Sequence, residues 1–581
     1  MDRASTASTK AALALLIFLF AANCYRAATQ SITTDEALTF DKFVAPHLDE
    51  IFAHYDANNH VLNTALAWIS VEALGIREFP LRLPSVLGGA LYLWGVYRLA
   101  RLVFGTGPFF LAAVALSALN PLLLDHLSAA RGYGLALAFL TWALINMIEF
   151  LDASVGQASW ARSKRHGLED VKFAGNWCLE RAWPVRTGRE ADPTARPSTA
   201  SSTGRLLDSA ESAVRRTDLR RASRKLELAA VSLGLCVAAN LAFLYPVLAL
   251  SAAFLIALVP CPPNKVPASI CKPSDSVAPR HSHGAPNQAV TGLALSGKWR
   301  WDFVTDECIV PGVATAFVFL VLFLNHAEAG NFYFGAKTLD DAVTSLTVMS
   351  LYHNPGRPIF LGLHPDGFVV LRLLHPAVWI GLCVLILAGF GAGARILVRR
   401  EQGETPADSL LVLCGLAMAF IAAAIIVANH WLGVPYPLNR TSLYWIPLSA
   451  FTSLALVRKV GWRPLTVPAI GLAALLSVQY LCEFNVRAYS EWWDQSGSRP
   501  AMQAIRRDAG SRNIRIGVSD TLEPILNFYR ARHHIDNWAR VERRPLTENY
   551  DYYLLFLRDA NLVDRRHLTV LYRDSGLIAA R

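Results

Sequence analysis

Long apolar runs alternate with polar loops along most of the chain. A helix needs about 20 mainly apolar residues to cross the hydrocarbon core of a bilayer. Runs near that length predict eleven spans, at residues 11–28, 83–103, 108–124, 133–151, 227–243, 245–260, 308–325, 372–392, 408–428, 442–457 and 464–482. The pattern therefore predicts a polytopic α-helical membrane protein whose two termini lie on opposite sides of the bilayer.

The count of eleven depends on the 35-residue stretch from Leu226 to Pro260. A single tilted span rarely needs that length, and a proline inside a helix removes a hydrogen bond and breaks or kinks the helix. We therefore expect two spans that divide at Tyr245-Pro246. A single span would reverse the sidedness of everything that follows.

The charge of the loops supports this division. Cytoplasmic loops of membrane proteins carry an excess of Lys and Arg close to the span ends. With the N-terminus in the cytoplasm, the basic clusters fall in the inner loops 152–226, 393–407 and 458–463. The loops 152–226 and 261–307 are also rich in Pro, Ser and basic residues, which predicts mobile cytoplasmic insertions. The C-terminus then lies on the outer face.

The first apolar run has a second interpretation. Lys10, the apolar core from Ala11 to Ala22 and the small pair Ala27-Ala28 also fit a cleavable signal peptide. We take the run as a retained span and keep cleavage as the alternative.

Two outer regions have patterns of their own. The first outer loop, 29–82, contains an amphipathic stretch from Phe40 to Tyr55, broken at Pro46, which predicts interfacial helices. The tail, 483–581, alternates helical and strand-like runs, which predicts a small α/β domain on the outer face. The helical runs are 501–509 and 522–529, and the strand-like runs are 514–518, 552–557 and 568–572. Residues 1–482 then form the transmembrane domain.

Composition excludes most other classes. Hydrophobic residues make up 53% of the chain and charged residues only 17%, whereas a soluble globular chain carries about 25% charge. The net charge of +10 suits membrane orientation better than nucleic-acid binding, because the basic residues gather between apolar runs. The nine cysteines form no C-x-x-C and no zinc-ligand spacing, so neither a disulfide framework nor a metal framework is indicated.

Three predicted outer loops present charged groups near the membrane. Asp35 and Glu36 follow the first span, Asp125 and Arg131 lie in a loop of about eight residues, and Arg440 follows a late Tyr-Pro pair. Charges at membrane depth are expensive and mark functional sites. A carboxylate and two arginines are therefore the leading candidates.

The order of these motifs resembles the GT-C membrane glycosyltransferases, closest to the protein O-mannosyltransferases, lipid A aminoarabinose transferases and bacterial lipopolysaccharide sugar transferases. The resemblance covers roughly residues 10–480 and is carried by an Asp-Glu pair after the first span, a segment with a histidine, Arg-Leu-Pro-Ser entering span two, Ala-Arg-Gly-Tyr entering span four and a late Tyr-Pro-x-x-Arg. One departure is Asn59-His60-Val61-Leu62, where many relatives show His or Lys before Pro-Pro-Leu. The resemblance also implies a bacterial inner membrane with a periplasmic C-terminus.

The resemblance implies a polyprenyl-phosphate-linked sugar donor and a lipid, glycan or protein acceptor. Phosphate is a competent leaving group, so no carboxylic acid is needed to protonate it. We assign Asp35 as the general base of an inverting transfer, with Arg131 and Arg440 holding the departing phosphate. Glu36 and Asp125 could orient the acceptor or bind a divalent cation. The substrate-binding candidates besides the two arginines are Glu36, His60, Asp125, Tyr133, Lys337 and Tyr436.

Each assignment has a plainer alternative. Asp35 and Glu36 could cap an interfacial helix with Thr34 as the N-cap residue, and the two arginines could be anchors at span ends. We expect His126 and His430 to be interfacial polar residues. For the whole protein, the alternatives are a transporter or lipid flippase, which would show mid-span charges and matching halves, and a noncatalytic scaffold.

Overall fold

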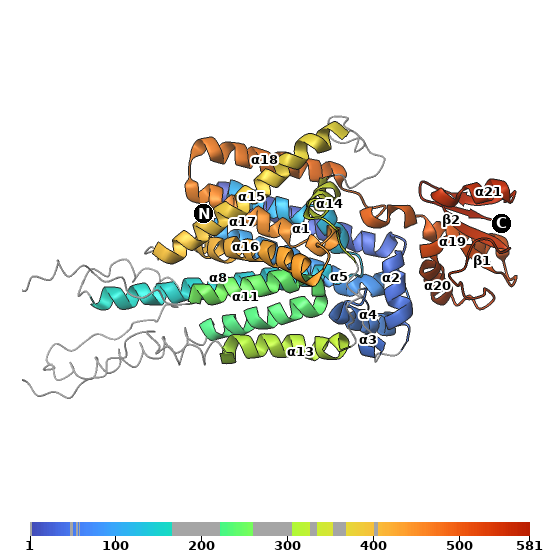
Figure 1. The fold of residues 1–581 in the computed structure, drawn as a ribbon, viewed down its shortest axis with the longest axis horizontal. Helices are drawn as coiled ribbons and strands as arrows, with labels where there is room; N and C mark the ends of the chain where they lie inside the picture. Colours follow the sequence, from blue (N-terminus) through green and yellow to red (C-terminus); the bar gives the residue numbers. More distant parts are fainter. Residues whose placement is uncertain are drawn as a thin grey trace, which may run out of the picture.

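The protein is described by a computed structural model that covers residues 3–46, 50–53, 56, 58–165, 221–258, 305–325, 334–351, 368–399 and 405–581. These residues are mostly helical, with one small sheet near the C-terminus (Figure 1). The long helices are α1 (Arg3–Thr29), α5 (Glu78–Phe104), α8 (Tyr133–Arg165), α11 (Leu244–Leu258), α13 (Val310–Leu324), α15 (Phe368–Arg399), α16 (Pro406–Leu432), α17 (Trp445–Val460) and α18 (Arg463–Glu483).

Six helical segments among the described residues are long and apolar enough to cross a membrane. They are Ser5–Thr29, Tyr133–Asp152, Leu241–Leu258, His375–Arg399, Pro406–Leu432 and Arg463–Glu483. The chain is therefore a helical protein with several membrane-crossing candidates. The count of eleven spans and the orientation of the termini stay predictions.

The helices pack around one large apolar core, in which α5 contacts α8 and α1 while α16 contacts α15 and α11. Close approach of α5 and α8 depends on Gly88, because a Cβ there would lie 2.6 Å from the Leu135 amide nitrogen. Elsewhere the bundle exposes large apolar side chains, among them Leu387 on α15 and Val467 on α18. An exposed apolar surface of this kind suits lipid.

The break in the stretch from Leu226 to Pro260 exists, but it lies five residues earlier than predicted. A helix runs over 221–239 and ends at Asn240, whose backbone is extended and whose side chain accepts the Ala242 amide hydrogen at 3.0 Å. After a short 3-10 turn, α11 begins at Leu244. Pro246 then falls in the first turn of α11, where its missing N–H costs nothing. The capping side chain, not the proline, divides the stretch.

The first outer loop is built from short helices. They are α2 (Thr34–Thr39), a π turn η1 (Phe40–Val44), α3 (Glu50–Ala53) and α4 (Val61–Leu74). The helical turns stop before Pro46, as predicted, whereas α4 was not predicted. Between α5 and α8 lie α6 (Pro108–Ala118) and α7 (Pro121–His126).

The tail contains each predicted element, with small shifts, in α19 (Ser498–Ala509), β1 (Ile516–Val518), α20 (Glu523–Arg532), β2 (Tyr552–Phe556) and β3 (Val570–Arg573). A fourth strand, β4 (Leu577–Ala580), was not predicted. The strand order is β1-β2-β4-β3, with β1 and β2 parallel and the other pairs antiparallel. The apolar core of the tail also includes Ile32, Ala37 and Phe40 of the first outer loop. The tail therefore packs directly on the loop that carries Asp35.

The two predicted insertions fall mostly outside the described residues. At their described ends the prediction of loops is wrong, because α8 continues to Arg165 and the next helix already begins at 221. Residues 305–307 of the second insertion belong to a π turn, η3 (Thr305–Ile309), that leads into α13.

Candidate functional site

Asp35, Arg131 and Arg440 meet at one end of the helix bundle. Asp35 lies in the first turn of α2, Arg131 lies between α7 and α8, and Arg440 lies in the 3-10 turn η5 (Asn439–Ser442). The Oδ2 atom of Asp35 is 3.0 Å from Nη2 of Arg440 and 3.5 Å from Nη2 of Arg131. Three loops distant in sequence thus place one carboxylate between two guanidinium groups. Hereafter these three residues are called the Asp35 cluster.

A capping box orients α2. The Thr33 side chain accepts the Glu36 amide hydrogen at 3.3 Å, and the Glu36 carboxylate accepts the Thr33 amide hydrogen at 3.0 Å. The N-cap residue is therefore Thr33, not Thr34 as predicted. Thr34 instead bonds the tail, donating its amide hydrogen to Gln495 at 2.8 Å and its hydroxyl to the Thr521 carbonyl at 2.7 Å.

Glu36 is fully occupied by structural contacts. Arg82 donates to both of its carboxylate oxygens, at 2.8 and 2.7 Å, and Ala130 donates its amide hydrogen at 2.8 Å. Arg82 also donates to the carbonyls of Gln30 and Ser31, and both charged side chains have no exposed surface. Burial alone would raise the pKa of Glu36, but Arg82 holds it below its usual value. The capping alternative is confirmed for Glu36, and these contacts join three segments of chain behind the site.

Arg131 is buried and only partly satisfied. Its Nη2 atom donates to Asn58 at 2.9 Å, while Nε and Nη1 have no hydrogen-bond partner among the described residues. The next residue, Gly132, has φ +70°, and a Cβ there would lie 2.2 Å from the Ala239 carbonyl oxygen. Only glycine fits this turn. Leaving buried N–H groups unpaired costs about 1–3 kcal/mol, so this guanidinium is suited to receive a ligand.

Arg440 bridges two carboxylates. Its Nη2 faces Asp35, and its Nη1 donates to Glu491 at 2.9 Å. The guanidinium also lies over two aromatic rings, at 4.9 Å from the Phe334 centroid and 5.4 Å from that of Trp492. Burial alone would lower the pKa of Arg440, but Glu491 and Asp35 raise it, so the side chain stays charged.

Two further predicted residues are placed by a backbone bridge beside Arg440. Ala336 and Tyr436 exchange amide hydrogens and carbonyls at 2.8 and 2.9 Å. This bridge carries Phe334 beneath Arg440. Lys337 is exposed beside the bridge, and Tyr436 is partly buried. Among the described residues, neither Lys337 nor the Tyr436 side chain forms a hydrogen bond or ion pair with the Asp35 cluster.

Two histidines pack on either side of Tyr133. The Tyr133 centroid is 5.4 Å from that of His60 and 4.9 Å from that of His126, both edge-on. Burial, followed by the charges of Arg131 and Arg440, holds the pKa of His60 well below its usual value. His126 is fully buried beside the cluster, and its interfacial position stays a prediction.

Asp125 pairs with a residue that the sequence analysis did not single out. Arg26 of α1 donates to Asp125 in a buried ion pair, and Ser490 donates its amide hydrogen to the same carboxylate at 2.7 Å. The Arg26 guanidinium lies 5.1 Å from the Tyr489 ring centroid. These contacts attach the short loop 125–132 to α1 and to the segment after α18.

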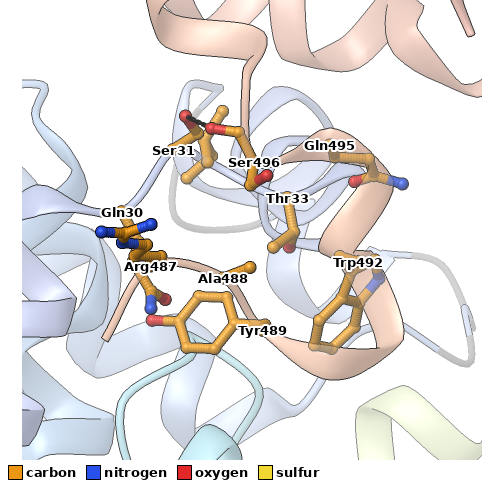
Figure 2. A pocket seen from close by; sticks show the side chains of 10 residues that line it. Gln30, Ser31, Thr33, Arg487, Ala488, Tyr489, Trp492, Gln495 and Ser496 are labelled. Atoms are coloured by element: carbon orange, nitrogen blue, oxygen red, sulfur yellow. Dashed lines mark hydrogen bonds between the residues drawn. The ribbon is translucent and has the colours of Figure 1, made fainter. Parts of the chain in front are cut away.

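Figure 2 shows how the loop after α1 meets that segment. Gln30, Ser31 and Thr33 face Tyr489, Trp492 and Ser496 across a small hollow, and Ser31 donates its hydroxyl to the Ser496 carbonyl at 2.6 Å. Nearby, the Ile32 amide donates to the Tyr529 hydroxyl at 3.1 Å. The tail therefore positions the loop that carries Asp35.

Several residues of the site were not predicted from the sequence. They are Arg26, Asn58, Phe334, Glu491 and Trp492. Their common feature is that no motif marks them. The run Ser-Glu-Trp-Trp-Asp that opens the segment after α18 was the one available signal, since aromatic and acidic residues there face the membrane surface.

No group of three or more His, Cys, Asp or Glu side chains that could hold a metal ion occurs within the described ranges. The divalent cation stays a prediction.

No family model and no curated relative matches this chain. Among solved structures, the chain is similar to ArnT from Cupriavidus metallidurans in the apo state, with 11% identity, coverage of 99% of this chain and 98% of that chain, and a TM-score of 0.40. The same enzyme bound to undecaprenyl phosphate is 12% identical, the match covers 99% of this chain and 98% of that chain, and the TM-score is 0.37. An oligosaccharyltransferase from Archaeoglobus fulgidus, crystallised with Zn and sulfate, is 13% identical. That match covers 97% of this chain and 72% of the other, with a TM-score of 0.38.

Proposed function

We propose that this protein is an inverting glycosyltransferase that moves a sugar from a polyprenyl-phosphate donor to an acceptor hydroxyl on the periplasmic face. One observation carries the proposal. A carboxylate with 18% of its side chain exposed lies between two guanidinium groups from two other loops, and one of these groups has unpaired N–H edges. Displacement of a phosphate by a hydroxyl requires a base for the hydroxyl proton and cations for the departing phosphate, and a carboxylate beside two guanidinium groups can supply both.

The arginines define the donor class. Guanidinium groups bind phosphate through two parallel hydrogen bonds and stay charged when buried. The surrounding bundle is apolar, and each buried methylene of a lipid contributes about 0.8 kcal/mol. A phosphate carried by a long isoprenoid chain fits both features, since its chain stays in the bilayer while its head group reaches Arg131 and Arg440. A lipid, glycan or protein hydroxyl would then accept the sugar.

Asp35 is the proposed general base. Burial alone would raise the pKa of Asp35, but Arg131 and Arg440 hold it below its usual value, so the carboxylate is ionised and can accept a proton. When the donor phosphate engages the same arginines, its negative charge raises the proton affinity of Asp35. The acceptor hydroxyl then loses its proton to Asp35 as its oxygen attacks the anomeric carbon opposite the phosphate, which leaves with the bonding electron pair. Such a base contributes about 10² to 10⁴ in rate.

The remaining predicted residues take supporting roles in this proposal. His60 and Tyr133, which pack against each other, are proposed to contact the sugar, and Lys337 and Tyr436 are proposed to contact the donor from the bridge beside Arg440. Glu36 and Asp125 hold the loops in position through Arg82 and Arg26. Dependence of transfer on a divalent cation is tested by adding a chelator. Residues 1–482 are proposed to supply the membrane domain and 483–581 a periplasmic domain that completes the site.

The proposal is tested by mass spectrometry of envelope lipids and glycans from cells with and without the protein. A sugar modification should be present with the wild type and lost with Asp35→Asn, while the variant is still inserted in the membrane. Asp41→Asn is a matched control, because Asp41 lies on the same loop but pairs with the exposed Arg540 at 2.8 Å. It should retain the modification. Normal modification by Asp35→Asn would remove the base from the proposal, and phosphate-linked lipid flipped in vesicles without sugar transfer would favour a flippase.

A further inference from the structure

Glu491 occupies part of the proposed phosphate site. It lies in the 3-10 turn η6 (Ser490–Gln495), in the segment after α18, and only 9% of its side chain is exposed. Its Oε2 atom accepts from Nη1 of Arg440 at 2.9 Å and lies 3.7 Å from Nε2 of His126. No motif in the sequence marks this carboxylate, and the mechanism proposed above does not use it.

The charges around Glu491 are balanced before any donor arrives. Arg131 and Arg440 supply two positive charges, and Asp35 and Glu491 supply two negative ones. A buried charge without compensation is costly. A sugar phosphodiester adds one negative charge and needs Arg440, whose two terminal nitrogens already face Asp35 and Glu491. One of the two carboxylates must therefore give up its contact.

Asp35 is not suited to leave. Its carboxylate must stay beside the acceptor to remove a proton, and α2 fixes it through the capping box and two bonds to the tail. Glu491 has no such task. Displacing Glu491 from Nη1 would open one edge of Arg440, next to the unpaired Nε and Nη1 of Arg131.

His126 provides an alternative partner for the displaced carboxylate. Its Nδ1 lies 3.0 Å from the Leu122 carbonyl, which requires the proton on Nδ1 and leaves the Nε2 lone pair facing Glu491. Nε2 has no hydrogen-bond partner among the described residues. Burial holds the pKa of His126 below its usual value, while the carboxylates of Glu491 and Asp125 act in the opposite direction. Uptake of one proton from solvent at low pH would therefore give a histidinium beside Glu491. The charged and titratable groups facing His126 are Glu491, Asp125, Arg440, Tyr133, Asp35 and His60.

We propose that Glu491 is a displaceable anion that fills one phosphate-binding edge of Arg440 until the donor arrives, and that His126 then receives the freed carboxylate. This inference rests on the proposed function, since it assumes that the ligand of Arg131 and Arg440 is a lipid phosphate. Glu491 is a positioning residue in this scheme, because it acts through Arg440.

The test is equilibrium binding of radiolabelled undecaprenyl phosphate to the full-length protein in lipid nanodiscs. Glu491→Gln keeps the shape of the side chain and removes the competing charge, so binding should tighten about tenfold, a change of about 1.4 kcal/mol. A merely structural role predicts no gain. Glu483→Gln is the matched control, because Glu483 is a second buried carboxylate, at the end of α18, and accepts a hydrogen bond from the Gln479 side chain. Its affinity should stay within about twofold of the wild type.

The pH dependence gives a second readout. Proton uptake by His126 helps the wild type to release Glu491, so the advantage of Glu491→Gln should shrink as the pH falls. Titration of the ligand itself cancels in the ratio of the two affinities. If Glu491→Gln does not fold, His126→Gln replaces it, with an expected weakening of binding and a loss of pH dependence beyond that of the ligand.

The outcomes separate the two ideas. If the wild type does not bind undecaprenyl phosphate, the proposed function fails and this inference fails with it. If the wild type binds, but Glu491→Gln binds equally or more weakly, or Glu483→Gln tightens binding as much, the inference is overturned and the proposed function stands.

Discussion

Asp35 and Glu36 are neighbours in sequence, but their surroundings differ. Glu36 is fully buried and accepts hydrogen bonds from Arg82, Thr33 and Ala130. Asp35 is 18% exposed and faces Arg131 and Arg440 at 3.5 and 3.0 Å, and two nitrogens of Arg131 find no partner in the described part of the chain. Because successive residues of a helix point in different directions, one turn of α2 supplies both carboxylates.

The comparison separates a charge that holds the structure from a charge that is available to a ligand. A buried ion pair with every hydrogen bond formed has nothing left to offer a substrate. An incomplete pair near solvent retains binding capacity, and perturbed groups of this kind gather at functional sites. The completeness of the hydrogen bonding, and not the charge itself, distinguishes the two.

The largest expected effect on stability concerns Glu36. Replacing Arg82 with Met would leave a buried carboxylate without its cation, which costs about 3–5 kcal/mol. Thermal unfolding of the purified protein in detergent should show this loss, whereas Asp35→Asn, at a partly exposed carboxylate, should lower the unfolding temperature less. The double variant Arg82→Met with Glu36→Leu should recover part of the stability. Equal losses for Arg82→Met and Asp35→Asn would break the comparison.

The next effect concerns donor binding. Arg440→Lys and Arg131→Lys keep the charge but lose the planar fork that matches phosphate. Each should raise the KM for donor about 10- to 100-fold, equivalent to about 1.4–2.8 kcal/mol, with little loss of folded protein. Arg540→Lys, at the exposed pair with Asp41, serves as the control. Unchanged KM values in both cluster variants would remove the phosphate clamp.

A smaller effect is expected in the pH dependence. Arg131 and Arg440 depress the pKa of Asp35 in the free protein, so kcat/KM should fall only as the pH drops below the ordinary aspartate value of about 3.9. Donor phosphate shares these arginines, so the acid limb of kcat should lie at higher pH. Stability from Glu36 is present above its unfolded pKa and is lost as the pH falls through its lowered folded value. Coincident acid limbs for kcat and kcat/KM would contradict the shared clamp.

The smallest effect tests how the tail positions the loop. Tyr529→Phe removes the hydroxyl that accepts the Ile32 amide hydrogen at 3.1 Å and leaves the ring in place. The loss should be about 1 kcal/mol of stability and a few-fold in transfer rate, measured by thermal unfolding and by transfer assays in parallel. Tyr550→Phe, in the same tail but away from the loop, should show neither change.

Much of the fold follows from local pattern. The apolar runs and the helix and strand order of the tail could be predicted, because periodicity acts over a few residues. The predicted break at Tyr245-Pro246 lies five residues after the observed one at Asn240, since the side-chain cap at Asn240 ends the helix before the proline is reached. Strand β4 was missed because Leu-Ile-Ala-Ala is too short and too plain to predict a strand without its partner β2.

The sequence by itself determined which residues carry the charge and that they precede or follow apolar runs, since both properties are written in the order of the amino acids. Only the tertiary structure decided that Glu36 forms a buried ion pair with Arg82 and that Asp125 forms one with Arg26. It also decided that Glu491, which lies 456 residues after Asp35, contacts the same arginine, Arg440. Such pairings depend on the approach of segments hundreds of residues apart, and hydrogen-bond completeness becomes defined only when all the partners of a charged group have assembled around it.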